Sequence, residues 1–146
     1  MSLDNLVGIS LERIEADPLA IQRLIEAAKR NINDSQITAV SNENRFDAAY
    51  KAIMQMASAA LQANGYRTLT NKPGHHQTMI QTLPNTIGLA REIMIVLDAL
   101  RKQRNVADYS GDLVAHSMVV ECIDHAQQLW TGLTGWMAES HPELLV

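Results

Sequence analysis

Apolar residues recur every three to four positions along four long stretches of this sequence, and that spacing is the periodicity of an α-helix. A helix with one apolar face must bury that face against another element. No stretch predicts a convincing strand. We therefore expect an all-α fold, an antiparallel up-and-down bundle of four long helices with one or two short helices.

Capping residues set the expected helix bounds. Asp17 is a good N-cap with Pro18 at the first helical position, and Asn64-Gly65 and Ser110-Gly111 are typical stops. The predicted long helices run from Pro18 to about Ile32, from about Ser41 to Asn64, from about Asn85 to about Asp108 and from about Asp112 to about Ser140. We expect short helices at His75–Leu83 and around Leu3–Leu11, and a loop over Tyr66–His76 whose last two residues lead into the first of these helices.

The predicted core follows the same spacing. Its members are Ile21, Leu24, Ile25, Ala28 and Ile32, then Phe46, Ala49, Tyr50, Ile53, Ala57 and Leu61, then Ile87, Ala90, Met94 and Leu97, and finally Val119, Cys122, Ile123, Ala126, Leu129, Trp130, Leu133, Trp136 and Met137. The last of these stripes is long and contains two tryptophans. It is either a well-filled core or a self-association surface, since Trp and Met are enriched at interfaces.

Composition agrees with one helical domain over residues 1–146. Hydrophobic residues make up 47% of the chain and aromatic residues only 4%, which suits helix packing better than a sheet. The single cysteine, Cys122, excludes an intrachain disulfide. Because no apolar run approaches a membrane span and the N-terminus lacks a signal-peptide pattern, we expect a soluble, cytoplasmic protein without a membrane partner.

The stretch "LRKQRNVADYSGD", Leu100 to Asp112, gathers cations in an otherwise acidic chain of net charge −4. On a helix, Arg101, Arg104 and Asp108 share one face, and Asn105 and Tyr109 form an adjacent pair. Guanidinium groups suit phosphate oxygens. The alternative to a binding site is an ordinary helix end. There the helix macrodipole favours cations, and polar residues commonly precede a terminating glycine.

"LRKQRNVADY" at the end of the third long helix, with "NKPGHH" before a short helix, resembles the HEPN superfamily of small helical domains. In that family an arginine, commonly followed by a polar residue such as asparagine, precedes a histidine by four to six positions. The resemblance implies a homodimer in which two motifs meet, and many members are metal-independent ribonucleases, including toxins. Others bind nucleotides, RNA or partner proteins without catalysis.

Carried over by residue, Arg104 matches the motif arginine and Asn105 its polar neighbour, whereas Tyr109 stands where a histidine is expected. A tyrosine, with an ordinary pKa near ~10, is a poor general base at neutral pH. We nevertheless name Arg104, Asn105 and Tyr109 as the candidate catalytic residues. Arg101, Lys102, Asp108, His75 and His76 are the candidate substrate-binding residues.

His75 and His76 begin the predicted short helix, after Lys72 and a Pro-Gly turn. If that turn lies near Arg104, one of these histidines can replace the missing proton-transfer group. Otherwise they are a solvated helix start.

We expect no metal and no cofactor. Glu121 and His125 are one turn apart, but the other long helices offer no comparable inward carboxylates, and nucleotide-binding glycine patterns are absent from the sequence. Two functions remain open: an RNA- or nucleotide-phosphate-binding domain with endoribonuclease activity, and a non-catalytic module that binds an antitoxin-like protein or a neighbouring enzyme.

Overall fold

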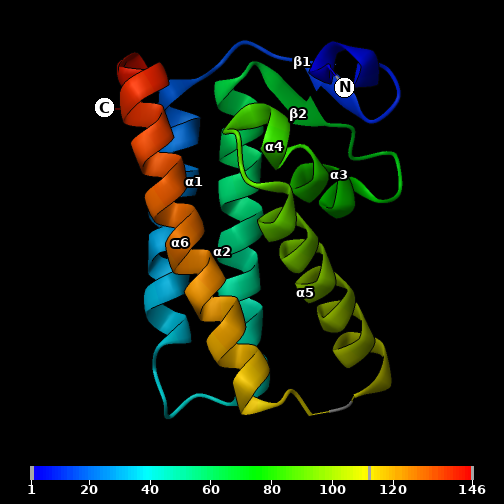
Figure 1. Cartoon of the computed structure of the whole chain (residues 1–146), viewed down its shortest axis with the longest axis vertical. Helices are drawn as coiled ribbons and strands as arrows, with labels where there is room; N and C mark the ends of the chain where they lie inside the picture. The colour runs from blue at the N-terminus through cyan, green and yellow to red at the C-terminus, as the bar shows by residue number, and fades with distance from the viewer. Residues whose placement is uncertain (1, 112, 146) are drawn as a thin grey trace.

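The computed structural model describes residues 2–111 and 113–145, without the side chains of 108–110. It is mostly helical, which confirms the predicted all-α class (Figure 1). In chain order the elements are a 3₁₀ helix (Leu3–Leu6), β1 (Leu11–Arg13), α1 (Pro18–Ser35), α2 (Asn42–Ala63), β2 (Tyr66–Thr68), α3 (His75–Gln81), α4 (Leu83–Thr86), α5 (Arg91–Ser110), α6 (His116–Ser140) and a second 3₁₀ helix (Pro142–Leu144).

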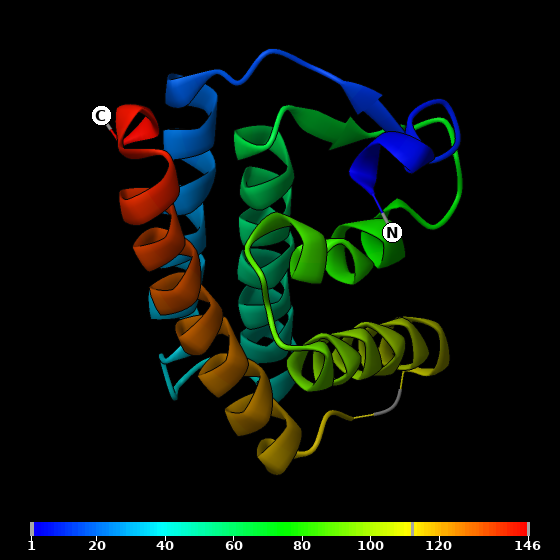
Figure 2. The same ribbon diagram turned by 45° about the horizontal axis from the view of Figure 1, so that its top comes forward.

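Helix α2 is the centre of the fold. It runs antiparallel to α1 and packs against both α1 and α6 along much of its length (Figure 1). On its other side lie α3 and α5, and α5 inclines away from α6 toward its C-terminal end (Figures 1 and 2). Because α2 meets helices on several sides, its buried residues extend well beyond one stripe and include Ala52, Met56 and Ala59.

The predicted N-cap Asp17 is confirmed, and Ser41, predicted as the approximate start of the next helix, is its N-cap. The Asp17 carboxylate accepts a hydrogen bond from the Leu19 N–H at 3.0 Å, and the Ser41 hydroxyl accepts one from the Asn44 N–H at 3.3 Å. Helix α2 ends at Ala63, and Gly65 turns the chain with a φ of +88° that side chains disfavour.

The expectation that the chain contains no strand is wrong. β1 and β2 pair antiparallel, with Leu11 opposite Thr68 and Arg13 opposite Tyr66. Part of the predicted loop and the end of the predicted N-terminal helix are therefore strand, and the 3₁₀ helix ends at Leu6. Each strand has only three residues, so neither displays the alternation by which strands are recognised.

Two helices begin later than predicted. Pro84 lies in the separate short helix α4, and Gly88, with a φ of +71°, turns the chain before α5 begins at Arg91. Ala90, predicted as core, is exposed at the N-cap of α5. Helix α6 begins at His116 and not near Asp112, because the buried Val114 is held in extended chain: its N–H donates to Glu43 and its carbonyl accepts from Asn42.

The apolar stripe of α6 is mainly core. Cys122, Leu129, Leu133 and Met137 are buried, while Trp130 and Trp136 are half-buried and pack against the same core. Lys29 on α1 places its ammonium 4.6 Å from the centre of the Trp130 ring. Of the two interpretations of this stripe, the well-filled core accounts for most of its residues.

Candidate functional site

Arg104 points from α5 toward α2. Its Nε lies 3.8 Å from Oδ1 of Asp47, and its guanidinium carbon lies 5.1 Å from the centre of the Tyr50 ring. Leu97 and Leu100, both buried, fix the face of α5 that packs inward, and Arg104 follows one turn after Leu100. The arginine is therefore held against an aromatic face while part of its side chain stays accessible.

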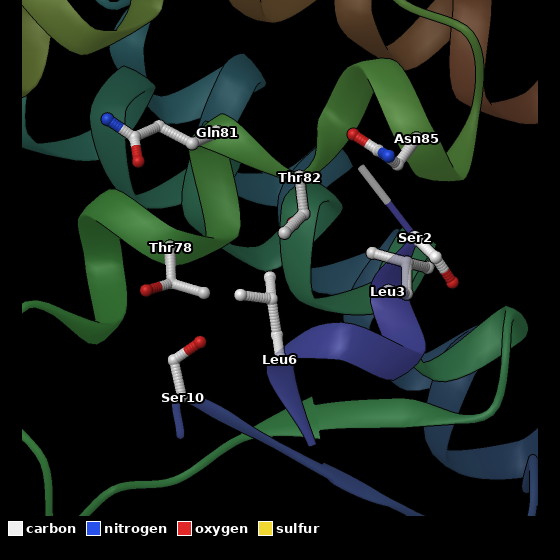
Figure 3. A pocket seen from close by; sticks show the side chains of 8 residues that line it. All are labelled: Ser2, Leu3, Leu6, Ser10, Thr78, Gln81, Thr82 and Asn85. Atoms are coloured by element: carbon white, nitrogen blue, oxygen red, sulfur yellow. The ribbon is translucent and has the colours of Figure 1, made fainter. Parts of the chain in front are cut away.

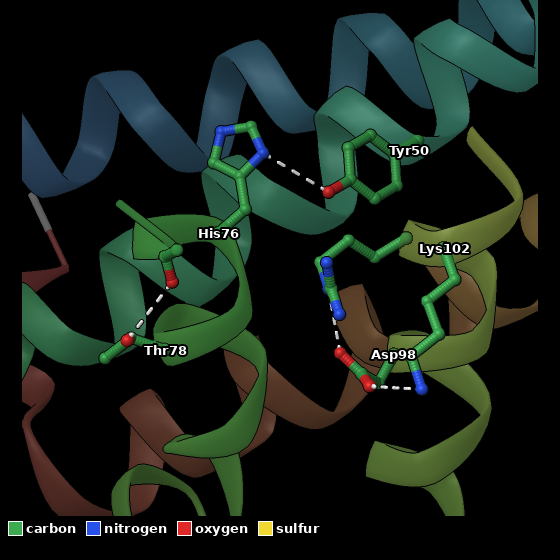
Figure 4. Close-up of polar contacts among 7 residues, drawn as sticks. Tyr50, His76, Thr78, Asp98 and Lys102 are labelled. Carbon is green, nitrogen blue, oxygen red and sulfur yellow. Dashed lines mark hydrogen bonds and ion pairs between the residues drawn. The ribbon is translucent and has the colours of Figure 1, made fainter. Parts of the chain in front are cut away.

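His76 approaches the same place from α3. Gly74 adopts a left-handed conformation with a φ of +78° immediately before this helix. The turn carries the His76 ring toward α2, where Nδ1 lies 3.3 Å from the Tyr50 hydroxyl (Figure 4). His75 lies beside it, with the two rings 4.7 Å apart and edge to face. Tyr50 thus contacts both an arginine on α5 and a histidine on α3.

Burial and nearby positive charge set the protonation states of Tyr50 and His76. Burial raises the pKa of Tyr50 to about 12, against the opposing effect of the Arg104 and Arg101 cations. Burial also lowers the pKa of His76, as do the positive charges of His75, Arg104 and Arg101. Near neutral pH the phenol is therefore protonated and the imidazole neutral. In the tautomer that carries its proton on Nδ1, His76 donates to the Tyr50 oxygen, so that Nε2 is an acceptor and the phenol proton can go to a ligand; in the other tautomer the phenol donates to Nδ1.

These side chains line one cleft of about 530 Å³ between α1, α2, α3 and α5. Its apolar wall consists of Leu24, Met54 and Met79. The polar side chains that line it are Asp47, Tyr50, Lys51, Gln55, Ser58, His76 and Arg104. An apolar wall with a few convergent polar groups is the usual composition of a small-ligand site, and the volume lies in the usual range.

A second recess of about 190 Å³ lies between the N-terminal 3₁₀ helix and α3–α4 (Figure 3). Hydroxyl and amide side chains such as Thr78, Gln81 and Asn85 surround it, together with Leu3 and Leu6. None of the described residues that line it is charged. It therefore lacks the cations that would attract an anionic ligand, and the cleft at Arg104 is the better candidate.

Arg101 and Lys102 do not line the cleft. Arg101 forms an ion pair with Asp98 at 2.8 Å, and both side chains are about 15% exposed or less. Lys102 extends into solvent, with its Nζ 3.6 Å from the other oxygen of Asp98 (Figure 4). Arg101 contributes positive charge near Tyr50 and His76, but its guanidinium is committed to Asp98.

The other predicted site residues are placed differently. Asn105 is exposed on the outer face of α5, and His75 is half-buried beside His76 without lining the cleft. The side chains of Asp108 and Tyr109 lie outside the described residues. The structure therefore brings Arg104 and His76 together, and it adds Tyr50 and Asp47, which sequence reasoning missed as site residues. Tyr50 was visible only as a core position, although its hydroxyl is a polar group that must find a partner when the ring is buried.

Among residues 2–111 and 113–145, no three His, Cys, Asp or Glu side chains are grouped so that they could hold a metal ion. Within the same residues, no helix is long and apolar enough to cross a membrane. No model of a known protein family matches the chain, and neither does any curated protein.

Proposed function

We propose that this chain is a HEPN-like helical-bundle domain that binds a phosphate group of RNA or of a nucleotide in the cleft at Arg104. The observation that carries the proposal is the convergence of the Arg104 guanidinium, the Tyr50 phenol and the His76 imidazole on one cleft with an apolar wall. Arginine supplies charge and a fork of donors for phosphate oxygens. Leu24, Met54 and Met79 offer a surface for a base or a ribose.

Asp47 is the main argument against an anion at this place. Its carboxylate is 3.8 Å from Arg104 and offsets part of the arginine's charge. However, the Asp47 side chain is 50% exposed, so its attraction for Arg104 is weakened by solvent. A phosphate that makes two hydrogen bonds to the guanidinium competes well with such a pair.

The same cleft supports metal-independent cleavage of RNA as the activity. His76, neutral near pH 7, can accept the proton of a ribose 2′-hydroxyl at Nε2 while that oxygen attacks the adjacent phosphorus. The bond from phosphorus to the 5′-oxygen breaks, a cyclic 2′,3′-phosphate forms, and the 5′-oxygen takes a proton from water. Arg104 and the Tyr50 phenol stabilise the charge that develops on the phosphate oxygens. His76 in this way replaces the histidine expected at position 109.

The proposal includes a homodimer, as the HEPN resemblance implies, in the cytoplasm, as the sequence pattern leads us to expect. Two large apolar side chains on the outer face of α5 support a partner surface: Ile95 is 59% exposed and Val106 is 53% exposed. They lie about three helical turns apart and so share one face. Leu113, which follows α5, is exposed as well.

The exposed Ile95 and Val106 side chains also suit a second candidate function, a non-catalytic module that binds another protein. Exposed apolar residues that share a face are typical of protein-binding surfaces. In that case Arg104 and His76 are structural, and an antitoxin-like protein or a neighbouring enzyme covers Ile95 and Val106. Light scattering on the purified chain and on Val106→Glu separates a self-association surface, where the mass falls in the variant, from a surface for a different protein.

The decisive experiment measures the affinity of the chain for a single-stranded RNA that carries 2′-O-methyl riboses, so that cleavage cannot occur. Arg104→Gln is compared with Arg91→Gln, which removes the same charge from an exposed position at the start of the same helix. We expect Arg104→Gln to weaken binding about tenfold and to reduce the slope of log K against log salt by about 0.7, the value for one phosphate contact on a single strand. Arg91→Gln should stay close to wild type.

Cleavage is tested separately with unmodified RNA in the presence of a chelator. We expect a cyclic 2′,3′-phosphate product from the wild type and none from His76→Gln. If Arg104→Gln binds RNA as wild type does, or if the wild type shows no salt-dependent affinity at all, the phosphate-binding function is wrong and the interaction module takes its place.

A further inference from the structure

The cleft at Arg104 does not end at α2. Another polar recess, of about 450 Å³, lies between α1 and α2, and we call it the outer recess. Lys51 and Gln55 line both the outer recess and the cleft at Arg104. The side chains of α2 that line the two recesses recur at three- and four-residue spacing, from Asp47 to Ser58, and so follow one face of the helix. The two recesses therefore adjoin each other on one face of α2, where Lys51 and Gln55 line both.

A hydrogen bond joins the two helices that form the outer recess. Asn31 on α1 donates a hydrogen bond to the Gln55 side chain on α2 at 2.8 Å, and both residues are partly buried. This contact joins the walls of the outer recess and holds the two helices in register. The outer recess is thus formed by packed helices and not by a loop.

Two cations stand at the outer recess. Arg30 on α1 and Lys51 on α2 line it from facing helices, and both are exposed. The ion pairs of the described residues leave neither of them with a carboxylate partner. Asp34 lines the same recess, so the local balance is two cations to one carboxylate in a chain of net charge −4.

We propose that Arg30 and Lys51 form a second phosphate subsite, adjoining the one at Arg104, so that the ligand is a single-stranded RNA segment with successive phosphates rather than a mononucleotide. This inference rests on the proposed function, because it assigns the next phosphate of the same ligand. Lys51 stands at the junction of the two recesses, and Arg30 belongs to the outer one alone. The apolar wall of the inner cleft receives the base between the two phosphates.

The test compares two probes, uridine monophosphate and an octauridylate with 2′-O-methyl riboses, by calorimetry over a range of salt concentrations. Arg30→Gln is the informative variant because Arg30 lines only the outer recess, whereas Arg104 lines only the cleft. We expect it to weaken the octamer severalfold, to reduce the octamer's salt slope by about 0.7, and to leave uridine monophosphate binding unchanged. Arg104→Gln should weaken both probes, and Arg91→Gln neither.

The other outcomes distinguish failure of the second subsite from failure of the proposed function. If Arg30→Gln affects the octamer no more than Arg91→Gln does, while Arg104→Gln still weakens uridine monophosphate, the second subsite is wrong and the proposed function stands. If Arg104→Gln leaves both probes unaffected, or if wild type binds neither, the proposed function fails and this inference fails with it.

Discussion

The guanidinium of Arg104 lies over the ring of Tyr50, 5.1 Å from its centre, although the two residues belong to different helices of the fold. This contact joins the C-terminal part of α5 to α2. A cation over an aromatic face is attracted to it, by about 0.5–1 kcal/mol where solvent has access. Tyr50 therefore orients Arg104 through its ring and His76 through its hydroxyl.

Tyr50→Phe separates these two roles, because phenylalanine keeps the ring and removes only the hydroxyl. We expect the variant to fold, with a free energy of unfolding about 0.5–1.5 kcal/mol lower for the lost hydrogen bond to His76. Cleavage of RNA should fall more than binding of the 2′-O-methyl RNA, since Arg104 keeps its position over the ring. Equal losses of binding and cleavage would contradict a distinct role for the hydroxyl.

Asp47→Asn should have the opposite effect on affinity. The Asp47 carboxylate is 3.8 Å from Arg104 and competes with any anion for its charge. An exposed ion pair of this kind contributes about 0.2–1 kcal/mol, so its removal should tighten binding of a phosphate ligand up to about fivefold. Titration with uridine monophosphate at low salt measures the change. Weaker binding in Asp47→Asn would mean that the carboxylate positions Arg104 and does not compete for it.

The helices could be predicted because their signals are local. Asp17, Ser41 and Gly65 act on their own segments through caps and turns, and the apolar spacing of each helix identifies its buried face. The β1–β2 ribbon could not be predicted in this way, because its pairing joins residues far apart in the chain, such as Leu11 and Thr68. The late start of α6 has a similar cause, since Val114 is held by two residues of α2.

The candidate site was predictable only in part for the same reason. Arg104 and His76 were named from sequence because cations at a helix end and histidines after a Pro-Gly turn are local patterns. That they share a cleft, and that Tyr50 lies between them, depends on how α3 and α5 pack on α2. Asn105 was named with Arg104 because it follows it in sequence, but neighbours in a helix point in different directions, and Asn105 is exposed.

The lowered pKa of His76 predicts how stability depends on pH. The unfolded chain binds a proton at this histidine near pH 6.5, more readily than the folded chain does. The folded state therefore has its full stability above about pH 6.5 and loses stability as the pH falls through the lower pKa of the folded state. Urea unfolding at about pH 7.5 and about pH 5 should show a smaller loss in His76→Gln than in wild type.

His116 supplies the matched control for that measurement, because it is an exposed histidine at the first residue of α6. His116→Gln should lose as much stability as wild type over the same pH interval. Under the proposed function, the rate of RNA cleavage should fall over the same acidic range, since His76 must be neutral to accept a proton. A cleavage rate that stays constant down to about pH 5 would rule out His76 as the base.

Leu97 tests whether the site depends on the packing of α5. Among the described side chains of α5, the buried Leu97 and Leu100 anchor the helix in the core. The described residues of α5 pack mainly on α2, α3 and α4. Leu97→Ala should lower the free energy of unfolding by about 2–5 kcal/mol, whereas Leu19→Ala, the same truncation at an exposed position of α1, should change it by less than about 0.5 kcal/mol. Under conditions where Leu97→Ala is still folded, phosphate affinity should also fall, because Arg104 is presented by the same helix. Unchanged affinity in a folded, destabilised variant would mean that contacts with Tyr50 and Asp47 alone position Arg104.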